Sequence, residues 1–143
     1  MRFWDTSAVV PLLVTQPLSG SLHAEYDRDP SLVVWWATRV ECASAIAHLE
    51  REGGLNLDEA GAARARLDAL SAAWSELQPT TPVRRKAERL LRVHALRAAD
   101  ALQLAAALAA ADDDPRSLPV LTTDDRLALA AEREGFLVVR PAR

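Results

Sequence analysis

The chain has 143 residues, of which 50% are hydrophobic and 26% charged, with a net charge of −3. This length and composition predict one globular domain over residues 1–143 and exclude a disordered chain. The acidic balance excludes binding of nucleic acid by bulk positive charge, so such a partner needs local basic patches or bound cations. A single cysteine, Cys42, excludes an internal disulfide and a cysteine-based zinc site.

No segment predicts a membrane span, because the longest apolar run, 101–111, is too short and is interrupted by Gln103. Asp5 interrupts the N-terminal apolar stretch where a signal peptide would continue. We therefore expect a cytoplasmic protein with no membrane partner.

Short apolar runs alternate with segments of helical periodicity along the chain. Such alternation is typical of an α/β fold with a parallel sheet covered on both faces. In chain order, the predicted elements are strand 3–4, helices 8–14 and 18–27, strand 32–36, helices 38–52 and 59–74, a weak strand 76–78, helices 82–95 and 98–111, strand 118–121, helix 124–134 and strand 136–139.

Polar residues at element ends indicate helix caps. We expect Ser7 to cap the first helix, Asp58 the fourth, and Thr122 or Thr123 the last. Pro11 is expected in the first turn of its helix, where proline is tolerated.

Apolar positions predict the core. The run at 32–36 is typical of a strand buried on both faces, which places both Trp35 and Trp36 inside. The periodicity of helix 82–95 turns Leu91 and His94 inward and its basic residues outward.

The motifs of several enzyme classes are absent. The five glycines form no dinucleotide fingerprint or P-loop, and no Gly-x-Ser-x-Gly elbow occurs. His23, His48 and His94 lack the spacing of a zinc pair. These absences exclude dehydrogenases, P-loop ATPases, serine hydrolases and zinc proteases.

Four acids lie where predicted strands pass into helices. Asp5 ends the first strand, Glu41 follows the second, Asp100 opens the alanine-rich helix and Asp124 follows the fourth strand. In a doubly wound sheet these positions share the crevice beyond the strand C-termini. Any one of them is explained as a surface acid or helix cap, but Glu41 and Asp100 have apolar neighbours unlike a water-facing helix surface.

Carboxylates gathered in one crevice repel one another unless cations bind. Oxygen-only ligands select hard cations such as Mg²⁺ or Mn²⁺, which can activate water and stabilise a leaving oxygen. The predicted reaction is phosphodiester hydrolysis.

Four segments together resemble the PIN domain, and most of all the single-domain VapC toxins of bacterial VapBC toxin–antitoxin pairs. They are Asp5-Thr6-Ser7, Glu41 in Thr-Arg-Val-Glu-Cys-Ala, Asp100 in Leu-Arg-Ala-Ala-Asp-Ala-Leu, and Asp124 in Leu-Thr-Thr-Asp-Asp-Arg-Leu. The resemblance runs from Arg2 to about Val139.

The resemblance implies a three-layer α/β/α fold with a central parallel sheet of four to five strands. It also implies a Mg²⁺- or Mn²⁺-dependent endoribonuclease that cleaves structured RNA such as tRNA or rRNA. Such toxins are usually homodimers silenced by a cognate VapB-like antitoxin. By motif, Asp5 and Asp100 are the leading metal ligands, and Glu41 and Asp124 complete the acidic quartet, partly through water.

Neighbouring residues receive weaker expectations. Spacing favours Asp124 over Asp125, which is then an exposed helix acid. Arg39 and Arg97 are expected to contact substrate or pair with a carboxylate, while the basic face of helix 82–95 either guides phosphates or is only solvated. The apolar helix pair at 8–27 is hypothesised to form part of an antitoxin groove.

Two other functions remain open. A haloacid dehalogenase-type phosphatase also begins with a strand ending in Asp, but it needs a second acid where Ser7 stands and a well-placed lysine. An interaction module that kept the fold and lost turnover is the non-enzymatic alternative.

Overall fold

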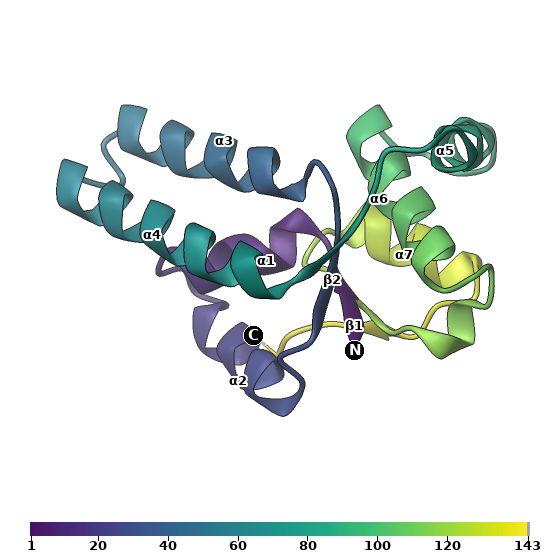
Figure 1. The fold of residues 1–143 in the computed structure, drawn as a ribbon, viewed down its shortest axis with the longest axis horizontal. Helices are drawn as coiled ribbons and strands as arrows, with labels where there is room; N and C mark the ends of the chain where they lie inside the picture. Colours follow the sequence, from purple (N-terminus) through teal and green to yellow (C-terminus); the bar gives the residue numbers. More distant parts are fainter. Residues whose placement is uncertain (143) are drawn as a thin grey trace.

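The structure, a computed structural model, describes residues 1–142 (Figure 1). Five parallel strands form one sheet in the order β3-β2-β1-β4-β5, with helices on both sides. This arrangement confirms the predicted three-layer α/β/α fold class. The elements are β1 (Arg2–Trp4), α1 (Thr6–Leu13), α2 (Ser19–Arg28), β2 (Leu32–Trp35), α3 (Thr38–Arg51), α4 (Leu57–Ala73), β3 (Ser75–Leu77), α5 (Thr81–Val93), α6 (Ala98–Ala110), a 3₁₀ turn (Pro115–Ser117), β4 (Val120–Leu121), α7 (Asp125–Arg133) and β5 (Val138–Val139).

Successive residues of each strand point to opposite faces of the sheet, and two cores result. Phe3, Val33 and Val120 pack against α5, α6 and α7, whereas Trp4 and Leu121 pack against α1 to α4. Figure 1 shows these two groups of helices on opposite sides of the strands. The strands are short, yet β2 and β4 are fully buried and β1 nearly so, whereas the edge strands β3 and β5 are partly exposed.

The central strand is β1, and successive strands are added first on one side of it and then on the other. From β1 the chain moves outward through β2 to β3, then returns to place β4 and β5 on the other side. Phe3 is paired with Val33 in β2 and with Val120 in β4. A reversal of this kind opens a crevice at the carboxyl ends of the strands, here between β1 and β4.

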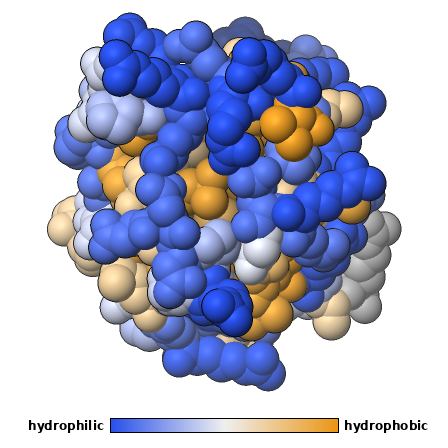
Figure 2. Space-filling view, turned by 90° about the vertical axis from the view of Figure 1, so that its right-hand side faces the viewer, coloured by the Kyte–Doolittle hydropathy of each residue, from blue (hydrophilic) through white to orange (hydrophobic). Residues whose placement is uncertain are grey.

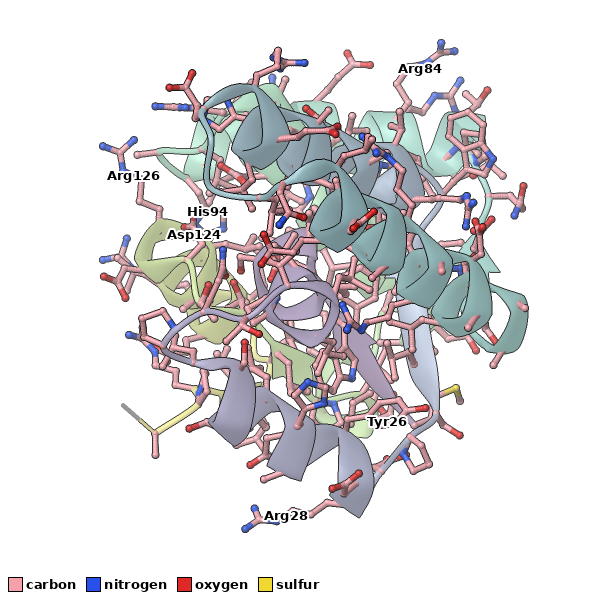
Figure 3. The ribbon with its side chains drawn as sticks, turned by 90° about the vertical axis from the view of Figure 1, so that its left-hand side faces the viewer. Tyr26, Arg28, Arg84, His94, Asp124 and Arg126 are labelled. Carbon is pink, nitrogen blue, oxygen red and sulfur yellow. The ribbon has the colours of Figure 1, made fainter. Side chains whose placement is uncertain are left out.

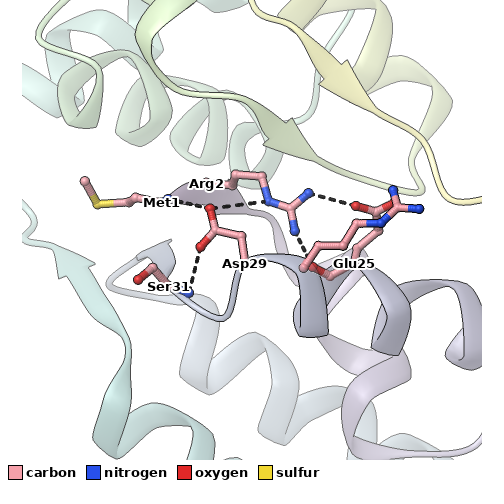
Figure 4. A network of polar contacts seen from close by, with 6 residues as sticks. Met1, Arg2, Glu25, Asp29 and Ser31 are labelled. Atoms are coloured by element: carbon pink, nitrogen blue, oxygen red, sulfur yellow. Dashed lines mark hydrogen bonds and ion pairs between the residues drawn. The ribbon is translucent and has the colours of Figure 1, made fainter.

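The opposite end of β1 is tied to α2 by a network of charges (Figure 4). The guanidinium of Arg2 donates to a carboxylate oxygen of Glu25 at 2.8 Å and also to its backbone carbonyl. The amino group of Met1 pairs with Asp29, which also accepts the backbone N–H of Ser31. The Arg2–Glu25 pair is largely buried, so it is screened less than a surface ion pair.

The start of α4 differs from the sequence prediction. Asn56, and not Asp58, is the N-cap, and its side chain accepts the backbone N–H of Glu59. Glu59 returns a hydrogen bond to the backbone N–H of Asn56, which completes a capping box. The prediction of Asp58 was therefore wrong by two residues.

Two predictions of burial were also wrong. Trp35 is buried, but Trp36 is 51% exposed because β2 ends at Trp35 and the chain leaves the sheet there. Leu91 is 42% exposed because α5 packs against the molecule with only a narrow stripe, in which Leu90 and His94 are buried. Among residues 1–142, no helix has the length and apolar character needed to cross a membrane.

Candidate active site

The four predicted acids lie at the carboxyl edge of the sheet. Asp5 directly follows β1, and its backbone N–H donates to the carbonyl of Leu121 at 3.1 Å. Asp124 follows β4 and immediately precedes α7, while Glu41 and Asp100 lie in the first turns of α3 and α6. Because β1, β2 and β4 are parallel neighbours, their ends bring these segments together.

Asp5 is the most buried of the four, with 4% of its surface exposed. Burial raises its pKa to about 7, against an ordinary value of 3.8. Hydrogen bonds from Ser7 and Thr122 act in the opposite direction, and the charge of Asp124 adds to the increase. Near neutral pH and without a counter-charge, this carboxyl group is therefore protonated in a large fraction of molecules.

Ser7 joins the β1 and β4 sides of the site through one hydroxyl group. Its Oγ donates to Oδ1 of Asp5 at 2.7 Å and accepts the backbone N–H of Thr123 at 2.9 Å. The hydroxyl of Thr122 lies 3.2 Å away. Helix α1 begins two residues earlier than predicted, with Asp5 at its N-cap position and no side-chain capping bond. The prediction that Ser7 caps this helix was therefore wrong.

Pro11 lies inside α1 and not in its first turn, because the helix begins at Thr6. A proline has no N–H, so the carbonyl of Ser7, four residues earlier, loses its helical partner. That carbonyl instead accepts the hydroxyl of Thr123 at 3.3 Å. The hydrogen bond that proline omits thus leaves this carbonyl free to form a second link between α1 and the segment that carries Asp124.

Asp124 has a structural role in addition to its place in the site. Its Oδ1 accepts the backbone N–H of Leu127 at 2.9 Å, which makes it the N-cap of α7 in place of the predicted threonines. The hydroxyl of Thr122 accepts the backbone N–H of Asp124 at 3.0 Å, which holds the backbone at the start of α7 in place. One carboxylate oxygen of Asp124 is left for other partners.

Glu41 is held by a side chain that sequence reasoning did not select, that of Gln103. The amide nitrogen of Gln103 lies 3.1 Å from Oε1 of Glu41 and 3.0 Å from the hydroxyls of Thr6 and Thr38. Thr6 also donates to Oε2 of Glu41 at 3.3 Å. The available signal was the spacing, because Gln103 is three residues after Asp100 in an otherwise apolar helix and so shares its face.

The carboxylates influence one another electrostatically. Burial raises the pKa of Glu41 and of Asp100, and two neighbouring charges add to it: Asp100 acts on Glu41, and Asp124 acts on Asp100. However, among residues 1–142 no three Asp, Glu, His or Cys side chains are grouped closely enough to hold one metal ion. The four acids share an edge without converging on one point.

Comparison with known proteins decides the family. The model of the PIN domain family matches residues 2–133. The chain belongs to the PIN domain family. Ribonucleases VapC45 and VapC49, from two strains of Mycobacterium tuberculosis, are each 33% identical to it over 136 residues, which cover 95% of this chain and 92% of the relative. The crystal structure of FitAcB from Neisseria gonorrhoeae has the same fold, with a TM-score of 0.67, 21% identity and 96% of each chain covered.

Arginines of this PIN domain flank the acids. Arg97 and Arg126 line a hollow of about 430 Å³ together with Asp100, Asp124 and Asp125. Both guanidinium groups lower the pKa of Asp100, although burial and Asp124 outweigh them. In Figure 3, Arg126 points away from the body of the molecule.

The remaining charged residues are distributed as follows. Asp125 is exposed, as expected, and pairs with Arg140 at 3.2 Å. Arg39 pairs with Asp68 of α4 and lies outside the acidic set. The outer face of α5 is basic, and Figure 2 shows a largely hydrophilic surface on the side of the molecule to which α5, α6 and α7 belong. The exposed arginines of that helix are Arg84, Arg85, Arg89 and Arg92.

The chemistry of the donor atoms suits a hard divalent cation, although the carboxylates of residues 1–142 do not converge on one point. They are carboxylate oxygens with neighbouring hydroxyls, and neither His nor a thiolate accompanies them. Oδ1 of Asp5 and Oε1 of Glu41 are already oriented by hydrogen bonds. Such an oxygen-rich set is typical of Mg²⁺ or Mn²⁺ sites in proteins.

Proposed function

We propose that this PIN domain is a divalent-cation-dependent endoribonuclease and the toxin of a toxin–antitoxin pair, acting as one domain in the cytoplasm. The observation that carries the proposal is the buried acidic edge around Asp5 in a chain whose relatives, 33% identical over 95% of its length, are named ribonucleases. The substrate class is RNA, of which tRNA and rRNA are the first to test.

Asp5 and Asp100 are the leading metal ligands in this proposal, and Glu41 and Asp124 complete the set, partly through water. A bound Mg²⁺ or Mn²⁺ supplies charge neutralisation, an acidified water and stabilisation of the leaving oxygen. Mutual repulsion of the carboxylates in the absence of a cation supports this assignment.

The chain's own residues position these groups. Ser7 orients Asp5 through Oδ1, and Gln103 with Thr6 orients Glu41. Arg97 and Arg126 bind phosphate beside Asp100 and Asp124, because a guanidinium matches phosphate oxygens in geometry and charge. Positioning and electrostatic stabilisation are the two contributions that phosphoryl chemistry most requires of a protein.

An endonuclease assay tests the proposal. We expect Asp5→Asn and Asp100→Asn each to reduce Mg²⁺-dependent RNA cleavage at least 100-fold while the far-UV circular dichroism stays unchanged. Asp112→Asn is the control, since Asp112 is exposed and its positive φ of 51° suits asparagine. Sequencing of RNA ends after brief induction identifies the substrate, and full activity in either site variant contradicts the assignment.

The interaction-module alternative makes a different prediction for cation binding. A nuclease binds Mn²⁺ measurably in calorimetry, and Asp100→Asn weakens that binding. A module without turnover binds Mn²⁺ weakly or not at all, and the substitution makes no difference. The phosphatase alternative predicts instead a covalent phosphoryl group on Asp5, which mass spectrometry detects.

An antitoxin partner is supported by a hollow between α1, α2 and α4. It has a volume of about 270 Å³ and is lined by apolar residues of α1 and α4, with His23 and Tyr26 from α2 and Arg66 from α4. Tyr26 is marked in Figure 3. We propose that a VapB-like antitoxin packs here and that the toxin is a homodimer. Amide exchange with and without antitoxin tests the groove, since unchanged protection in α1 and α2 contradicts it.

A further inference from the structure

Three hollows with shared lining residues follow one another along the carboxyl edge of the sheet, and we call them together the groove. The first, which we call the Leu18 pocket, has a volume of about 440 Å³ and is lined by Ser7, Pro11, Gln16, Pro17, Leu18 and Thr123. A narrow section of about 80 Å³ shares Leu18 and Thr123 with it and continues past Asp124. The third is the 430 Å³ hollow at Arg97 and Arg126, which shares Asp124 with the narrow section.

The two wide hollows adjoin the acidic edge at different residues. The Leu18 pocket reaches the site through Ser7, whose hydroxyl bonds Asp5. The arginine hollow reaches it through Asp100 and Asp124. A polymer that follows the three hollows therefore passes Asp124 between the two wide ones, and it passes Ser7, whose hydroxyl bonds Asp5.

The lining of the Leu18 pocket suits a flat, neutral group. It contains no charged residue, and Pro11, Pro17 and Leu18 supply its apolar surface. The hydroxyls of Ser7 and Thr123 are already engaged within the fold.

The amide of Gln16 is different. The backbone N–H of Gln16 donates to the hydroxyl of Ser19, but within residues 1–142 the half-buried side chain of Gln16 makes no hydrogen bond. A free amide offers both donors and an acceptor, which is what the edge of a nucleobase requires.

The opposite end of the groove suits an anion. Arg97 and Arg126 are exposed, and neither makes an ion pair shorter than 4.0 Å with any residue of the described chain. Both lower the pKa of Asp100, which lines the same hollow. These two guanidinium groups are therefore free to contact backbone phosphates.

We propose that the Leu18 pocket is a nucleobase subsite of the substrate RNA, with Arg97 and Arg126 holding phosphate on the far side of the cleaved bond. The proposal rests on the ribonuclease function above and adds the source of its sequence preference. A base can enter the pocket only when it is unpaired and unstacked. The nucleotide next to the cleaved bond is therefore single-stranded, even where the rest of the RNA is folded.

The test separates base contacts from phosphate contacts. A randomised single-stranded RNA library is cleaved by the wild type, by Gln16→Ala and Leu18→Ala, and by Arg126→Gln, and the new ends are sequenced. We expect the wild type to prefer one base beside the cut, and either pocket variant to reduce that preference at least fivefold. Arg126→Gln leaves the preference intact. Gln78→Ala, an exposed glutamine in the loop between β3 and α5, is the control.

A binding measurement does not depend on cleavage. Asp5→Asn protein in EDTA is titrated with fluorescein-labelled single-stranded RNA at several salt concentrations. Adding Arg126→Gln should reduce the slope of log K against log salt by about 0.7, as expected for one lost phosphate contact. Adding Gln16→Ala or Leu18→Ala should weaken binding at least fivefold without changing the slope.

The outcomes distinguish the two proposals. Wild-type protein that cleaves no RNA contradicts the ribonuclease function, whatever the pocket binds. Wild-type protein that cleaves RNA, with base preference and affinity unchanged in both pocket variants, overturns the nucleobase subsite alone. Circular dichroism and thermal unfolding confirm that each variant is folded. Loss of antitoxin binding with unchanged base preference also overturns the subsite, because it assigns the pocket to a protein partner.

Discussion

At the scale of single residues, the site depends on neutral side chains that position charged ones. Ser7 and Gln103 carry no charge, yet each holds a carboxylate that we assign to the metal site. Gln103 is 2% exposed, and its buried nitrogen lies within hydrogen-bond distance of three oxygen atoms. Removing such a residue leaves its polar partners unsatisfied, and this costs more than the bond itself contributes.

Replacement of Gln103 tests this positioning role. Gln103→Leu keeps much of the volume but removes the amide nitrogen that lies within hydrogen-bond distance of Glu41, Thr6 and Thr38. We expect the free energy of unfolding to fall by about 1–3 kcal/mol, measured by urea unfolding, and kcat to fall more than KM rises. Gln78→Leu, at an exposed position, is the matched control. A wild-type urea midpoint in Gln103→Leu means that the network does not stabilise the fold.

The raised pKa of Asp5 predicts how the cation-free protein responds to pH. The folded state holds the proton up to about pH 7, whereas the unfolded chain loses it near 3.8. The unfolding free energy in EDTA should therefore fall as pH rises from about 4 to 7. Asp5→Asn removes this dependence and should be more stable than wild type at pH 7.5, by up to about 4 kcal/mol.

Thermal unfolding in EDTA at a series of pH values measures this effect. Asp112→Asn serves again as control, because Asp112 is exposed. Identical pH profiles for wild type and Asp5→Asn would show that burial of Asp5 does not cause the pH dependence of stability. Added Mn²⁺ should reverse the order of stability, since only the wild type offers the carboxylate.

At the scale of elements, helix starts are fixed by side-chain geometry that several nearby residues can satisfy. Asn56 and Asp58 are both good N-cap residues, and the sequence alone did not decide between them. The structure selects Asn56, because Glu59 stands three residues later and completes the box. The apolar periodicity located α4 correctly but placed its start two residues too late and its end one residue too late.

Two alanine substitutions test the start of α4. Asn56→Ala should destabilise the protein by about 1 kcal/mol, because it leaves a backbone N–H of the first turn without its partner. Asp58→Ala should cost only a few tenths of a kcal/mol, through the helix dipole. Parallel urea titrations compare the two, and a larger effect at Asp58 would restore the original cap prediction.

The sequence predicted that the acids lie at one edge of the sheet, because the carboxyl ends of parallel strands all meet at the same edge. It did not predict which hydroxyl or amide would face each acid. The hydroxyl of Ser7 donates to Asp5 and does not cap the helix backbone. Thr123, which is distant in sequence, lies beside it and donates its backbone N–H to the same hydroxyl. The exposure of Trp36 likewise depends on where β2 ends, which a continuous apolar run does not mark.

At the scale of the whole molecule, polar contacts join α5 to α7 within one helical layer. Glu134, which directly follows α7, accepts from Arg89 of α5 at 3.1 Å and lies 2.7 Å from His94, the residue that caps the end of α5. Partial burial acts to raise the pKa of Glu134, but the hydrogen bonds from His94 and Arg89 outweigh it and hold that pKa below 4.5.

This contact predicts an acid-sensitive contribution to stability. A carboxyl group with a lowered pKa stabilises the fold above its unfolded value and loses that effect as pH falls through the folded value. Glu134→Gln should reduce the free energy of unfolding by about 1 kcal/mol at pH 7, and this difference should shrink by pH 3. Glu132→Gln, an exposed position on α7, is the control. An equal deficit at both pH values contradicts an ionic contribution.

The pairing of β1 with β4 also sets the order in which the protein can be completed during synthesis. Ser7 and Thr123 are 116 residues apart, and β1 is central, so the middle of the sheet stays open until β4 has been translated. Contacts of such long range form late and slowly. A nascent chain therefore carries Asp5 without its partners, and the RNA-cleaving site that we propose is assembled only after β4 has left the ribosome.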